Sequence, residues 1–246
     1  MNRNHEEIKQ PEIPPAKKKI ALPSEVVWLF ALVLIAFSVS MTVAAGLGVS
    51  TIVCPAYLVS EKVSFLTFGQ AEYILQGVLF IAFCFAVRRF RWVYLSSFFS
   101  CLLYGLVLDA FQKYVPLFNA AVTPPESLHL AARIALLAGG MVLTSLSIAL
   151  FFKVYLYPQV YDFFVKGIVE RYRLKEGLTK TIFDLSFLAL SAILTFALFG
   201  TIVGIGWGTL AMAICNGTLI GLFSKAFDRL FVAKPIFPKL AKFFEI

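Results

Sequence analysis

Long runs of apolar residues dominate this sequence and alternate with short polar stretches. Each run is about twenty residues long, which is the length of α-helix that crosses the hydrocarbon core of a bilayer. The pattern therefore predicts six transmembrane helices in an all-α membrane protein. The six runs are 25–48, 68–88, 92–112, 129–153, 181–202 and 208–225.

Two shorter segments follow the first and fourth runs. One begins at Pro55 and ends near Lys62. The other is 157–173, where apolar side chains recur at positions i, i+3, i+4 and i+7 and charged residues occupy the other face, a pattern typical of an amphipathic helix. We expect such segments either to lie in the membrane interface or to re-enter the membrane.

The ends of the chain differ from its middle. Residues 1–23 are polar and rich in proline, which predicts a disordered tail. Residues 231–246 repeat the amphipathic pattern on a smaller scale and predict a short amphipathic tail. Between the tails, 24–127 and 128–230 form two halves with three predicted spans each.

Composition agrees with a membrane protein. Hydrophobic residues make up 60% of the 246 residues, charged residues 15%, and the mean hydropathy is +0.85. Soluble domains are about 45–50% apolar and about 25% charged. The net charge of +8 is spread between apolar runs rather than gathered on one module, so we expect a lipid bilayer as the partner and no nucleic acid.

Lysine and arginine positions set the expected orientation, because cytoplasmic loops carry an excess of them. With six spans and a cytoplasmic N-terminus, 19 of the 22 basic residues lie on the cytoplasmic side, and the C-terminus is cytoplasmic too. The three on the outside are Lys62, Lys113 and Arg133. An odd number of spans would spoil this partition.

The two halves resemble each other in sequence. Ser38-Val-Ser40 in the first run matches Ser145-Leu-Ser147 in the fourth, and Tyr104-Gly105 near the end of the third matches Ile220-Gly221 near the end of the sixth. Because each half has three spans, the second half enters the membrane from the opposite side. The pattern predicts a 3+3 inverted repeat, which is common in secondary transporters.

Several glycine-containing motifs resemble the YczE/YyaS/YitT family of bacterial membrane proteins over about 26–228. They are 45–51 (AGLGVST), 98–109, and above all Gly204-Ile-Gly206-Trp-Gly208-Thr209. One departure concerns 154–162, where Pro158 is present without the glycines that often accompany it in that family. The resemblance implies the fold and a bacterial cytoplasmic membrane, and it implies no substrate.

Polar residues inside the spans are the candidates for function, since they are costly in a membrane. Glu72 lies about one turn into the second span with Gln76 one turn further on, and an inward-facing carboxyl there is suited to carrying a proton. Asn216 lies halfway along the sixth span, and Tyr57 lies on the short segment after the first. We expect these four residues to bind a substrate or couple its movement; hydration of Glu72 and helix-to-helix hydrogen bonding by Asn216 are the alternatives.

Two further features concern helix contacts. Asp109 and Arg133 fall near the outer ends of the third and fourth spans, which predicts an ion pair or an outer gate. Gly217-x-x-x-Gly221 predicts a close helix contact.

No nucleophile–base set, nucleotide motif or metal-ligand spacing is visible, so we expect neither an enzyme nor a cofactor or metal. The sequence favours a secondary transporter of an unknown small solute. The alternative is a non-transporting partner subunit or assembly factor, and a homo-oligomer or a membrane partner is compatible with either.

Overall fold

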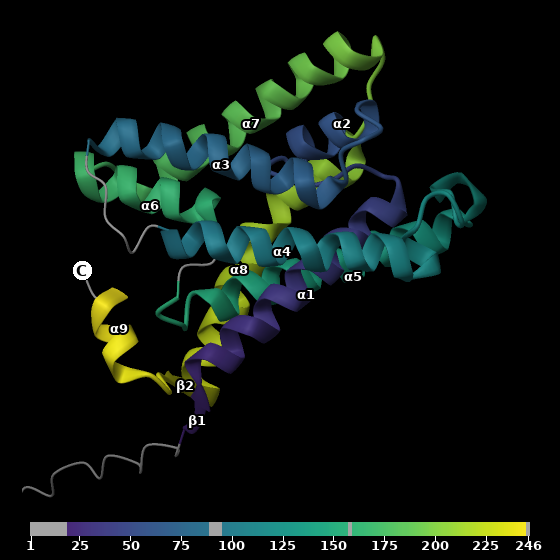
Figure 1. Ribbon diagram of the computed structural model, residues 1–246. Helices are drawn as coiled ribbons and strands as arrows, with labels where there is room; N and C mark the ends of the chain where they lie inside the picture. The colour runs from purple at the N-terminus through teal and green to yellow at the C-terminus, as the bar shows by residue number, and fades with distance from the viewer. Residues whose placement is uncertain (1–18, 89–94, 157–158, 245–246) are drawn as a thin grey trace, which may run out of the picture.

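A computed structural model describes residues 19–88, 95–156 and 159–244 (Figure 1). Six of its helices are long and apolar enough to cross a membrane, which confirms the predicted spans and indicates a multi-pass membrane protein. These helices are α1 (Ser24–Ala45), α3 (Phe68–Val87), α4 (Leu95–Tyr114), α5 (Leu130–Phe151), α7 (Glu176–Phe199) and α8 (Trp207–Leu230).

Short elements connect the long helices. The segment after α1 forms helix α2 (Cys54–Lys62), and the predicted amphipathic segment forms α6 (Val160–Tyr172), while residues 157–158 lie outside the described ranges. The apolar face of α6 is buried against α3 and α7. The remaining short elements are η2 (Pro116–Phe118), η3 (Pro125–Ser127) and α9 (Pro238–Phe244).

Helices α1 and α5 form the centre of the molecule. Ser38 Oγ and Thr144 Oγ1 share a hydrogen bond of 2.9 Å, and Ser147 Oγ donates to the carbonyl oxygen of Ala31. A Cβ at Gly140 would lie 2.6 Å from Thr42 Cγ2, so the two helices meet closely there. In a lipid bilayer the hydrophobic effect does not drive helices together. Close packing of small side chains and interhelical hydrogen bonds stabilise the helix contacts instead.

The two ends of the described chain meet in a small parallel sheet. Strand β1 (Ile20–Pro23) pairs with β2 (Phe231–Lys234). This corrects the predicted disordered tail of 1–23, of which 1–18 lie outside the described residues: the four-residue apolar run at its end finds a partner just after α8, which the polar composition of the tail does not reveal. Because β1 leads into α1 and β2 follows α8, both ends of the span region lie at one face (Figure 1).

The order of elements is the same in the two halves: one long helix, one short helix and two long helices. Each short helix contacts a long helix of the other half. Helix α2 packs on α7 as well as on α3, and α6 packs on α3 as well as on α7. One pair breaks the correspondence. Helices α3 and α4 pack side by side, whereas α7 and α8 diverge from their connecting loop and do not pack along their lengths (Figure 1).

Candidate functional site

Two glycine-rich loops that are far apart in the sequence meet in the structure. The backbone N–H of Val49 donates to the carbonyl oxygen of Gly204 at 3.0 Å, and that of Gly208 donates to Leu47 at 2.8 Å. Gly48 has φ +108°, and a Cβ there would lie 2.6 Å from the nitrogen of Gly206. The motifs 45–51 and 204–209 are therefore glycine-rich because the two backbones touch.

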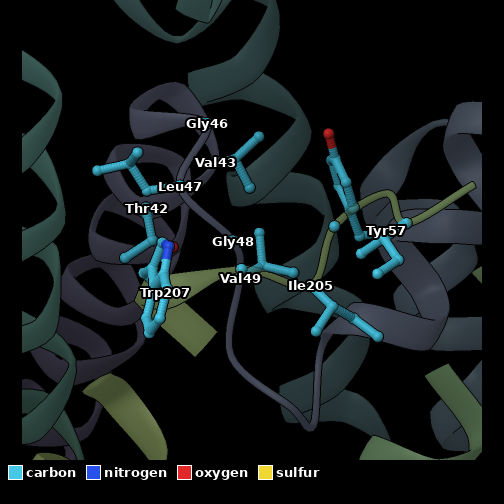
Figure 2. A pocket seen from close by; sticks show the side chains of 12 residues that line it. Thr42, Val43, Gly46, Leu47, Gly48, Val49, Tyr57, Ile205 and Trp207 are labelled. Carbon is cyan, nitrogen blue, oxygen red and sulfur yellow. The ribbon is translucent and has the colours of Figure 1, made fainter. Parts of the chain in front are cut away.

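A pocket of about 280 Å³ opens beside these loops (Figure 2). Tyr57 of α2 lines one side and Trp207 of α8 the opposite side, with the α1–α2 loop between them. Burial raises the pKa of the Tyr57 hydroxyl, and the Glu61 carboxylate raises it further. Tyr57 therefore borders the pocket as a neutral O–H group.

Glu72 and Gln76 lie together elsewhere, at the contact between α3 and α6. Both side chains are completely buried. Glu72 Oε2 accepts from Gln76 Nε2 at 3.1 Å and from the Tyr161 hydroxyl of α6 at 3.0 Å. Gln76 Oε1 in turn accepts from the backbone N–H of Val160 at 3.1 Å. The predicted pair thus joins a network that ties α3 to the short helix of the other half.

The second oxygen of Glu72 differs from the first. Glu72 Oε1 is buried and has no hydrogen-bond partner among the described residues. On the α4 side, Tyr104 and Cys101 are buried and lie close enough to interact electrostatically with the carboxyl group. A buried carboxyl group with no positively charged partner is costly when ionised, and either a proton or a bound cation removes that cost.

The predicted ion pair of Asp109 with Arg133 is absent from the part of the chain that the structure describes, and the alternative, an outer gate, stays a prediction. Asp109 accepts from the Thr67 hydroxyl at 2.5 Å and from the backbone N–H of Gly69 at 2.7 Å, so it fastens α4 to the first turn of α3. Arg133 donates to the carbonyl oxygens of Ala45 at 2.7 Å and Gly46 at 2.6 Å, at the end of α1.

The physical reason is that helix ends attract these charges. Free N–H groups at the first turn of a helix favour an anion, and free carbonyl groups at the last turn favour a cation. Asp109 contacts the first turn of α3, and Arg133 contacts the last turn of α1. Lying on the same side of the membrane did not bring the two side chains together.

Asn216 lies apart from the other candidates. It is half-buried on α8, and its Oδ1 accepts from the Ser145 hydroxyl of α5 at 3.4 Å. The residues that line the pocket include neither Asn216 nor Glu72. Gly217 and Gly221 have no atom within 4 Å of a Cβ built on them, so the predicted close helix contact is missing from this structure.

Tyr161 is the residue that sequence reasoning missed. Its position on the apolar face of the amphipathic segment was visible, but its bond to Glu72 was not. The available signal is that a buried tyrosine hydroxyl usually finds a polar partner, and Glu72 was already a candidate.

Comparison with known proteins identifies a family for this chain. No curated protein and no solved structure matches the chain. The resemblance to the YczE/YyaS/YitT family stays a prediction. Residues 22–225, which include both glycine-rich loops and all six candidate side chains, match a family of unknown function, DUF6198, and the chain therefore belongs to that family.

Proposed function

We propose that this protein is a secondary transporter of a small solute that works by alternating access between two three-helix halves of opposite orientation. The repeated order of long and short helices supports two related halves. So does the exchange of short helices, because α2 packs on α7 and α6 packs on α3, as a two-fold relation requires. Inverted halves place a transport pathway between them.

The unequal helix pairs are the observation that carries this proposal. In the first half, α3 and α4 are fastened by Asp109 and touch closely: a Cβ on Gly105 would lie 2.8 Å from the carbonyl oxygen of Gly69. In the second half, Gly221 matches Gly105 in the sequence repeat but has no neighbour within 4 Å. Related halves in unequal conformations are what one state of an alternating-access cycle looks like.

The orientation of the chain in the membrane decides to which side this conformation is open. The proposed location is the cytoplasmic membrane of a bacterium, with both termini in the cytoplasm. The clamp formed by Asp109 and Thr67 then lies at the outer end of α3, and α7 and α8 diverge toward the cytoplasm. The conformation is therefore closed outside and open inside, with α2 and α6 as the short segments that accompany the first and fourth spans.

Uptake by liposomes that contain the purified protein tests this proposal. The panel would cover labelled amino acids, organic acids, sugars, nucleosides and inorganic ions. We expect uptake of one class. Absence of uptake across the panel by correctly folded protein would contradict transport.

A reversible lock makes the test specific to alternating access. A Cβ on Gly77 lies 3.4 Å from the Phe98 ring across the α3–α4 contact, so the pair Gly77→Cys and Phe98→Cys suits a reducible thiol cross-linker. We expect the cross-link to stop uptake and reduction to restore it, with both single variants unaffected by the reagent. Uptake that persists in the locked protein would overturn the mechanism.

The open face of α8 favours a second candidate, a non-transporting partner subunit or assembly factor. Gly217 and Gly221 would admit the close approach of a helix from another membrane protein. Stable co-purification with one other chain, together with no effect of Glu72→Gln or Asn216→Ala, would favour this candidate over transport.

A further inference from the structure

We infer that Glu72 is a proton-binding site, with the proton on Oε1, and that Tyr161 links this proton to the position of α7. Binding of the proton stands on the geometry alone. Its role in driving solute movement rests on the proposed function, which it deepens by naming the coupling ion.

The surroundings of Glu72 favour a neutral carboxylic acid. The side chain is completely buried, and Oε2 takes both hydrogen bonds while Oε1 takes none. The titratable groups that face it are Tyr161 from α6 and Tyr104 and Cys101 from α4, and none of these carries a positive charge. An ionised carboxylate buried without a cationic partner costs several kcal/mol.

Helix α2 also packs on α3, and its titratable groups supply no positive partner for the Glu72 carboxyl group. They are Cys54, Tyr57, Glu61 and Lys62. No hydrogen bond or ion pair of the described residues joins Lys62, the one cation among them, to Glu72. Among the side chains that the structure describes on these helices, none that is positively charged forms a hydrogen bond or an ion pair with the carboxyl group.

A metal ion fits this site less well than a proton. Hard cations take about six or more oxygen ligands, whereas Glu72 Oε1 is the one unpartnered carboxyl oxygen of the network. The described residues contain no group of three or more His, Cys, Asp or Glu side chains that would hold a metal ion. A proton needs one oxygen and no further ligand.

Tyr161 gives the proton a mechanical link. Its hydroxyl bonds Glu72 on α3, and its ring lies edge-on against Phe187 of α7, with centroids 5.6 Å apart. Phe164 of α6 also packs on Phe183 of α7, with centroids 5.4 Å apart. Helix α6 is thus held to α7 by aromatic contacts, and to α3 by the Glu72 network and by Phe83, whose ring centroid lies 4.6 Å from that of Phe163. Tyr161 is the side chain of α6 that contacts both the Glu72 carboxyl group and Phe187 of α7.

This arrangement predicts how protonation follows the transport cycle. When α7 closes onto the open face of α8, Phe187 moves with α7, the Tyr161 ring follows it, and the Tyr161 hydroxyl leaves Glu72. The carboxyl group loses its cover and its hydrogen bonds, so it exchanges its proton with water. In the conformation described here the site is covered and the proton stays bound.

Infrared spectroscopy of the purified protein at neutral pH tests the proton site directly. We expect the carbonyl stretch of a buried protonated carboxylic acid, resistant to exchange. Glu72→Gln should remove this band, and Glu126→Gln, a matched change at an exposed glutamate in η3, should leave it. Absence of the band in the unaltered protein would overturn the inference, as would a band that survives Glu72→Gln.

Measurements in sodium and in potassium distinguish a bound proton from a bound metal ion at Glu72. Exchange of potassium for sodium should leave the unfolding temperature unchanged. If the unfolding temperature rises in sodium and Glu72→Gln abolishes that rise, the site binds a metal ion and the proton assignment is overturned. None of these readouts needs transport: a protein that shows the band but moves no solute contradicts the proposed function alone, and a transporting protein without the band contradicts the proton site alone.

The link through Tyr161 has its own test. Spin labels at Leu178→Cys on α7 and Leu222→Cys on α8, both exposed, should report an α7–α8 distance that changes with pH. The pH response should be lost in Glu72→Gln and in Tyr161→Phe. It should persist in Tyr172→Phe, which removes a hydroxyl from the same helix that bonds Ala86 instead. A response that survives Tyr161→Phe would overturn the link.

Discussion

Single charged side chains hold helix ends in this protein. Asp109 binds the first turn of α3, and Arg133 binds the carbonyl groups at the end of α1. Both side chains lie near the predicted outer surface, where an unsatisfied helix end would otherwise meet the membrane boundary. These contacts account for the two charged residues at the ends of apolar helices.

Asp109→Ala should destabilise the protein by about 1.5–3 kcal/mol, because it removes two hydrogen bonds to a carboxylate and leaves the backbone N–H of Gly69 in α3 without its partner. Asp228→Ala is the matched control, since Asp228 forms an exposed ion pair with Lys153 at 2.8 Å, and a surface pair contributes about 0–1 kcal/mol. Unfolding of both variants in detergent measures the difference. Equal losses would contradict the clamp.

The glycine-rich loops make a second residue-scale prediction. Gly48→Ala places a Cβ at a left-handed φ and against the backbone of Gly206, so we expect a loss of at least about 1–3 kcal/mol. Gly217→Ala, in open space on α8, should be neutral or slightly stabilising, because alanine favours a helix. The yield of folded protein and its unfolding temperature would check both, and tolerance of Gly48→Ala would contradict the loop contact.

At the scale of elements, the contact between α1 and α5 is the most extensive one between helices. Gly140→Ala should destabilise by about 1–3 kcal/mol, because the new Cβ meets Thr42 and the backbone of Ser38. Gly139→Ala is the neighbouring control: its Cβ meets the flexible end of Met41 at 2.9 Å, which can move aside. If thermal unfolding ranks Gly139→Ala as the worse variant, the described packing of α1 on α5 is wrong.

The elements also show what could be predicted from sequence. The six spans were predictable because run length alone decides whether a helix crosses a bilayer. The burial of Glu72 was predictable in part, since charged residues in spans tend to face inward. The bond from Tyr161 and the pairing of β1 with β2 were not, because both depend on which distant segments meet. The Asp109–Arg133 error has the same origin: a shared side of the membrane does not establish contact.

At the scale of the whole molecule, the two halves share an order of elements but differ in one contact. The α3–α4 pair is fastened and the α7–α8 pair is open. If the protein alternates, these two contacts exchange roles: α7 closes on α8 as α3 leaves α4. The buried network at Glu72 lies where α3 meets α6. We therefore expect its hydrogen bonds to change when α3 or α7 moves.

Spin-label distances across the α3–α4 pair and the α7–α8 pair test alternating access directly. One pair of labels sits at Leu178→Cys and Leu222→Cys, and the other at Ile74→Cys and Leu106→Cys, all exposed positions, with the half-buried Cys84 and Cys215 replaced by serine. We expect that, between acidic and alkaline pH or on addition of the transported solute, the α7–α8 distance shortens as the α3–α4 distance lengthens. Two distances that stay fixed under every condition, or that change in the same direction, would contradict alternating access.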